Sequence, residues 1–161
     1  MKQVMSPNTD PIVSIEAIAK KKFLGLATEL MEKELISKYE IRDVEWLEII
    51  LYRQLDHKQI SLGMLYSTEV FYHRFDVYTF VSCAYDMEDK VEVLDDLIDC
   101  AQVWLDKTDY YEEFYEKGDR VIYKRLIDSR YGVTRSASMV RGGWFRRFFG
   151  CKKRIVRPQG R

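Results

Sequence analysis

The clearest pattern of apolar and polar positions runs from Asp86 to Lys107. At the helical repeat of about 100° per residue, the apolar residues fall on one side and the carboxylates on the other. The apolar side consists of Val91, Leu94, Leu97, Ile98, Ala101, Trp104 and Leu105, and the acidic side of Glu88, Glu92, Asp95, Asp96, Asp99 and Asp106. This pattern predicts an amphipathic helix that buries one face in a core.

Four other segments show the same repeat in a weaker form. Asp10-Pro11 is typical of a helix start, and apolar residues recur at helical spacing from there to about Lys38. A short helix is expected over 109–116, and a further one over 119–132. Asp43 could cap another helix, whose apolar stripe would be Val44, Leu47, Ile50, Leu51 and Leu55.

Residues 69–85 fit both a strand and a helix. Their aromatic and β-branched content suits a strand, whereas Phe71, Phe75, Tyr78 and Tyr85 recur at helical steps. A single strand would lack a partner, because no second convincing strand or hairpin turn follows it. We therefore favour a helix here and predict an all-α fold. The expected architecture is one antiparallel bundle of about six helices, in which 69–85 is the segment that could be β.

Length and composition favour one folded domain. The chain has 161 residues, of which 47% are hydrophobic and 14% aromatic, and these are sufficient to fill a core. The three cysteines make neither a disulfide framework nor a metal-binding pair, so a reducing compartment is expected. The start of the chain is polar, and no apolar run reaches the roughly 18 residues of a membrane span. We therefore expect a cytoplasmic protein that is soluble or associates with a membrane surface.

Charge divides the chain into two unequal parts. Residues 129–161 contain ten Lys/Arg and no Asp or Glu, whereas residues 1–128 contain 16 basic and 26 acidic residues. The formal net charge of zero is therefore the sum of −10 in the body and +10 in the tail. We expect a flexible start over 1–9, an acidic helical domain over 10–131, and a basic, aromatic tail over 132–161 that anions attract.

The tail contains the candidate binding residues. Aromatic and basic side chains alternate in pairs within it, and a helix would place rings and arginines on opposite sides, as in helices that lie on membranes. Cys151 is a candidate acylation site that would add a second anchor. Ser138 lies three residues after a basic one and is a candidate phosphorylation site. The candidate anion-binding residues are Arg141, Trp144, Phe145, Arg146, Arg147, Phe148, Phe149, Lys152, Lys153 and Arg154.

Several partners fit such a tail. An anionic membrane would take up the rings at headgroup level and pair the basic groups with lipid phosphates. Single-stranded RNA would stack its bases on the same rings, and Lys20-Lys21-Lys22 could extend the basic path. Alternatively, the rings complete the core as a last helix. The tail could also pair with the region from Asp86 to Glu116, which holds twelve acids and two lysines, as an autoinhibitory latch that an anionic ligand opens.

No catalytic or metal-binding pattern occurs in the sequence. Asp56 and His57 are adjacent and would point apart on a helix, and His73 lies in the ambiguous aromatic stretch. Cys83 and Cys100 have apolar neighbours, which is typical of inert core thiols. We therefore expect no enzyme, cofactor or metal. The sequence favours a non-enzymatic adaptor or regulatory protein whose tail docks on an anionic membrane. RNA binding is the first alternative, and a protein-interaction or homo-oligomerisation module is the second.

Overall fold

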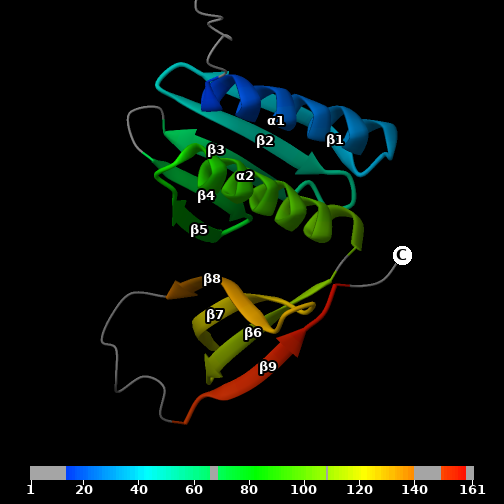
Figure 1. The fold of residues 1–161 in the computed structure, drawn as a ribbon. Helices are drawn as coiled ribbons and strands as arrows, with labels where there is room; N and C mark the ends of the chain where they lie inside the picture. The colour runs from blue at the N-terminus through cyan, green and yellow to red at the C-terminus, as the bar shows by residue number, and fades with distance from the viewer. Residues whose placement is uncertain (1–13, 66–68, 108, 140–149, 159–161) are drawn as a thin grey trace, which may run out of the picture.

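The computed structural model of the chain describes residues 14–65, 69–107, 109–139 and 150–158. Within these residues the protein is mostly β: nine strands form two antiparallel sheets, and two α-helices accompany them (Figure 1). The predicted all-α bundle of about six helices is therefore wrong. Of its helices, the strongly amphipathic one that begins at Asp86 is confirmed. The first one is confirmed over Ile15–Glu32 only, because a strand begins at Ile36, and its predicted start at Asp10 and the predicted flexible residues 1–9 lie outside the described residues.

Both helices lie on one face of a five-stranded sheet (Figure 1). α1 (Ile15–Glu32) begins at Ser14, whose side chain accepts a hydrogen bond from an amide of the first turn. α2 (Met87–Gln102) is capped in the same way by Asp86. The chain then continues into the π-helical turn η1 (Val103–Lys107), which leads towards the second sheet.

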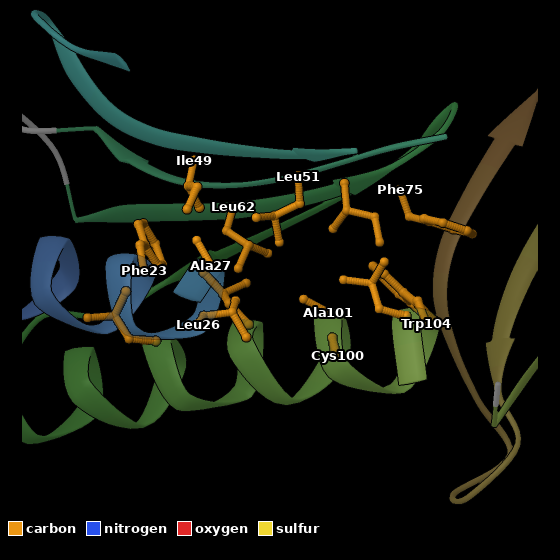
Figure 2. Close-up of a cluster of buried hydrophobic side chains, with 14 of the residues drawn as sticks. Phe23, Leu26, Ala27, Ile49, Leu51, Leu62, Phe75, Cys100, Ala101 and Trp104 are labelled. Carbon is orange, nitrogen blue, oxygen red and sulfur yellow. The ribbon is translucent and has the colours of Figure 1, made fainter. Parts of the chain in front are cut away.

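The five-stranded sheet is a meander in which each strand pairs with the next one along the chain. Its strands are β1 (Ile36–Asp43), β2 (Trp46–Arg53), β3 (Gln59–Leu65), β4 (Val70–Phe75) and β5 (Tyr78–Cys83). Alternate residues of the central strands face the helices and form the core with them. Figure 2 shows Ile49, Leu51, Leu62 and Phe75 of the sheet with Phe23, Leu26 and Ala27 of α1 and Cys100, Ala101 and Trp104 of α2 and η1.

The helix predicted after Asp43 is wrong. These residues form β2, which pairs with β1 as a hairpin. Its apolar residues match a helical repeat because β2 is buried on both faces. Ile49 and Leu51 face the helices, and Ile50, which points the other way, is only 3% exposed. The turn at 44–45 contains neither glycine nor asparagine, so nothing in the sequence marks a hairpin there.

Residues 69–85 contain the hairpin of β4 and β5, and the predicted helix is wrong. Phe75 pairs with Tyr78 across a two-residue turn in which Asp76 has a φ of 54°. Aspartate tolerates this left-handed conformation better than most residues do. The segment therefore supplies its own second strand, and β3 pairs with β4 on the other side. A turn of Asp and Val is a weak hairpin signal, so the sequence does not reveal the partner strand.

The second sheet has four strands in the order β8-β7-β6-β9. The helices predicted over 109–116 and 119–132 are wrong, because Gly118 and Gly132 close hairpins rather than helices. Their φ angles of 61° and 66° suit a glycine at the end of a helix as well as a glycine in a hairpin turn. The predicted domain boundary at residue 131 falls in the turn between β7 and β8, which pair with each other. The four strands are β6 (Tyr110–Lys117), β7 (Arg120–Asp128), β8 (Val133–Met139) and β9 (Lys152–Val156).

Polar contacts join the two sheets near the end of α2. Arg53, the last residue of β2, is buried and donates hydrogen bonds to the Trp104 carbonyl at 3.1 Å and to the Tyr110 hydroxyl at 2.7 Å. Tyr78 of β5 donates to a Glu112 carboxylate oxygen of β6 at 2.6 Å. Tyr110 also belongs to the same buried cluster as the apolar residues of the helices, so one core extends across the joint.

Candidate anion-binding strand

The last strand, β9, forms one edge of the second sheet (Figure 1). It follows Gly150, whose φ of 80° turns the chain, and Cys151 directly precedes it. β9 runs antiparallel to β6, with Lys152 opposite Glu116. Three consecutive basic residues at the start of β9 are thereby placed beside a strand that contains three glutamates.

Two of these basic side chains form ion pairs with β6. The Lys153 ammonium lies 2.7 Å from Glu113, and the Arg154 guanidinium lies 2.6 Å from Glu116. Glu113 is 2% exposed and also accepts a hydrogen bond from Arg125. Burial raises the pKa of Glu113, but the hydrogen bonds from Lys153 and Arg125 outweigh burial and keep this pKa below its ordinary value. The hydrogen bond from Arg154 lowers the pKa of Glu116. Both carboxylates are therefore ionised at neutral pH.

Aromatic rings of β6 hold two guanidinium groups at this edge. The guanidinium carbon of Arg154 lies 4.6 Å from the ring centroid of Phe114, and that of Arg157 lies 5.2 Å from the ring centroid of Tyr111. At such distances the negative face of the ring attracts the cation. The arginines are thus held by β6 without being removed from water.

The side chains of β9 remain accessible to a partner. Lys153 and Arg154 keep 47% and 52% of their side-chain surface exposed despite their ion pairs. Ile155, between basic neighbours, is 49% exposed. In the part of the chain that the structure describes, Lys152 and Arg157 form no ion pair. β9 therefore presents exposed basic groups on both faces of the sheet edge, with Lys152 and Arg154 on one face and Lys153 and the apolar Ile155 on the other.

Charge segregates between the two halves of the folded molecule. Residues 14–65 and 69–107, which form the helices and the first sheet, contain 11 Lys/Arg and 19 Asp/Glu, a net charge of −8. Residues 109–139 and 150–158, which form the second sheet, contain 10 Lys/Arg and 6 Asp/Glu, a net charge of +4. The described part of the chain therefore has an acidic half, formed by the helices and the first sheet, and a basic half, formed by the second sheet.

Two basic residues of the acid-free segment 129–161, Arg130 and Arg135, have a structural role instead. Arg130 links the buried Asp128 to Asp99 of α2, at 2.7 and 2.8 Å, and Arg135 lies 3.4 Å from Asp128. Burial raises the pKa of Asp128, but the hydrogen bonds and charge of Arg130, with the charge of Arg135, lower it further than burial raises it. Because these arginines neutralise a buried carboxylate, the tail charge counted from the sequence overstates the charge that a partner can reach.

The structure does not bring the remaining candidates together. Ser138 lies in β8 opposite Lys124 of β7, and Cys151 is half-buried before β9. Cys83, expected in the core, is exposed, because it lies on the sheet face that the helices do not cover. The other candidates, which lie outside the described residues, are Arg141, Trp144, Phe145, Arg146, Arg147, Phe148 and Phe149.

The basic run on α1 does not extend the path of β9. Lys20 forms an ion pair with Asp43, and Lys22 forms one with Asp95. α1 lies at the opposite end of the molecule from β9 (Figure 1). A single nucleic-acid strand along β9 would therefore not reach these lysines without crossing the acidic half.

Burial also displaces the pKa values of His73 and Cys100 in the interior. His73 of β4 lies against the rings of Phe80 and Trp104, and neither of its ring nitrogens has a hydrogen-bond partner in the described structure. Burial, reinforced by the charge of Arg135, lowers its pKa to about 4. Burial raises the pKa of the Cys100 thiol to about 11. Both groups are therefore neutral near pH 7. The described residues contain no group of three or more His, Cys, Asp or Glu side chains that could hold a metal ion.

The fold and the site define a small α+β protein with a basic edge strand. Comparisons with protein-family models, with curated proteins and with solved structures find no match for this chain. Neither helix of the described residues is both long and apolar enough to cross a membrane. The function proposed below is therefore inferred from the residues of this chain alone.

Proposed function

We propose that the protein is a non-enzymatic adaptor or regulatory protein whose basic C-terminal segment docks on an anionic membrane. The observation that supports this proposal is the separation of charge in the folded chain, with a net charge of +4 in the second sheet and −8 in the helical half. An anionic surface attracts the positively charged second sheet and repels the negatively charged helical half. The molecule would therefore approach the lipid with β9 foremost.

The basic groups of β9 provide enough energy for weak attachment. Lys152, Lys153 and Arg154 of β9 and Arg157 just after it would contribute about 1 kcal/mol each near an anionic leaflet, or up to roughly 4 kcal/mol when all four reach the lipid. Ile155 adds an apolar contact. Attachment of this strength is reversible, which suits a regulatory protein. Acylation at Cys151 would supply the second anchor that stable attachment requires. The aromatic residues that would deepen the contact are Trp144, Phe145, Phe148 and Phe149.

Sedimentation with lipid vesicles tests the proposal. Wild-type protein should bind vesicles that contain phosphatidylserine, should not bind vesicles of phosphatidylcholine alone, and should lose affinity as salt is added. Lys152→Gln removes a basic group that forms no ion pair in the described structure, and should weaken binding about fivefold. Lys21→Gln is the matched control, because it makes the same change on α1 and should leave binding unchanged.

Two results would count against the proposal. Equal binding to both kinds of vesicle would remove its electrostatic part, and an equal effect of the Lys152 and Lys21 substitutions would remove the role of β9. A titration with single-stranded RNA across a salt series tests nucleic acid as the alternative partner. RNA binding that depends on Lys152, without binding to anionic vesicles, would replace the membrane with nucleic acid as the partner.

A further inference from the structure

β9 is attached to its sheet mainly by charge and backbone pairing. Four of its five side chains are exposed, and only Val156 is partly buried. The side-chain contacts with β6 include the two ion pairs of Lys153 and Arg154, and the position of Arg154 over Phe114. On the other side of β6, by contrast, β7 contributes the buried Leu126. A strand held in this way is weakened when salt screens its charges or when another anion engages them.

Release of β9 leaves no buried charge without a partner. Glu113 is buried, yet it keeps its hydrogen bonds from Arg125 and from the Tyr115 hydroxyl when Lys153 moves away. Glu116 has a partly exposed side chain, which water can hydrate when Arg154 leaves. Removal of one partner from a buried ion pair is normally very destabilising because it strands the other charge. That cost is avoided at both carboxylates, so the other three strands can persist without β9.

We propose that β9 is an electrostatic latch, in which Glu113 and Glu116 compete with the anionic partner for Lys153 and Arg154. In the closed state, β6 occupies these two basic groups, and in the open state they contact the partner's phosphates. The identity of the partner rests on the proposed membrane docking, whereas the latch itself does not. Because closing and docking use the same groups, a change that weakens the closed state strengthens docking by up to the same factor.

Hydrogen exchange of the β9 amides tests the latch without a membrane. Glu116→Gln removes the ion pair with Arg154 and should accelerate β9 exchange by up to about fivefold relative to β7. Asp119→Asn is the matched control, because it removes the same charge from the neighbouring β6–β7 turn, where no ion pair with β9 is present in the described structure. Added salt should accelerate β9 exchange more in the wild type than in Glu116→Gln. Exchange of β9 as slow as that of β7 in every variant and at every salt concentration would overturn the latch.

Vesicle binding by the same variants separates the latch from the docking proposal. If both hold, Glu116→Gln binds phosphatidylserine vesicles up to about fivefold more tightly than Asp119→Asn, although the two variants have the same net charge. If docking fails and the latch holds, no variant binds vesicles, and Glu116→Gln still accelerates β9 exchange. If docking holds and the latch fails, the two variants bind equally tightly and exchange equally slowly.

Discussion

Acid is expected to destabilise this protein through one buried imidazole. His73 is 2% exposed, stacks on Phe80 and meets the edge of Trp104, and its two ring nitrogens have no hydrogen-bond partner in the described structure. Burial, together with the positive charge of Arg135, lowers its pKa from 6.5 to about 4. Between these two pH values the unfolded chain binds a proton at this position and the folded chain does not.

The direction and size of the effect follow from the two pKa values. Because the folded pKa is the lower one, the stability that depends on neutral His73 is complete above about pH 6.5 and decreases as the pH falls towards 4. One pKa unit corresponds to about 1.4 kcal/mol, so the complete effect is roughly 3 kcal/mol. Of this, about 2 kcal/mol is lost by about pH 5.

Urea unfolding near neutral pH and near pH 5 measures this loss. His73→Leu removes the imidazole and leaves an apolar side chain of similar size, while carboxylate titration affects both proteins equally. The wild type should lose about 2 kcal/mol more unfolding free energy than this variant over that interval. His57→Asn removes an exposed imidazole at a φ of 57° and should keep the wild-type loss. Parallel decreases in wild type and His73→Leu would refute the assignment to His73.

Two further substitutions test the polar contacts of the fold. Arg53→Lys should lower the unfolding free energy by about 2–4 kcal/mol, because an ammonium cannot replace a buried guanidinium that donates to several acceptors, Tyr110 among them. Gly63→Ala should cost about 1–3 kcal/mol, because its Cβ would lie 2.5 Å from the ring of Tyr72 and displace the 2.9 Å hydrogen bond from Tyr72 to the buried Glu48. Urea unfolding checks both, and wild-type stability in either variant would contradict the corresponding contact.

Local sequence patterns were sufficient for α2 and insufficient for the sheets. α2 is recognisable because its two faces meet different surroundings, with Leu97 and Ala101 in the core and Asp96 in water. β2 has buried residues on both faces, so the alternation of a half-exposed strand is missing. Its hairpin with β1 has no glycine or asparagine at the turn. Nothing within a short window therefore distinguishes this strand from part of a helix.

For the candidate site, the sequence shows the charges but not their pairing. The alternative that basic residues after 128 pair with acids in 86–116 is confirmed for three carboxylates, namely Asp99, Glu113 and Glu116. For Glu113 and Glu116, which base meets which acid depends on the register of β9 on β6. The Arg154 and Glu116 pair joins residues 38 positions apart, and no local pattern specifies such a register.

The position of β9 explains how one basic run can serve the fold and a partner. Unpaired backbone groups at a sheet edge are a template for aggregation, and charged residues, especially lysine, hinder it. A basic edge strand is therefore favoured even without a ligand. Lys153 and Arg154 also stabilise the sheet through their ion pairs, so their effects on stability and on docking are coupled. Lys152 and Arg157 have no ion pair within the described structure. Arg157 still lies over the Tyr111 ring of β6, whereas the charge of Lys152 contributes little to the fold, so Lys152 is the position where a docking function is separable from stability.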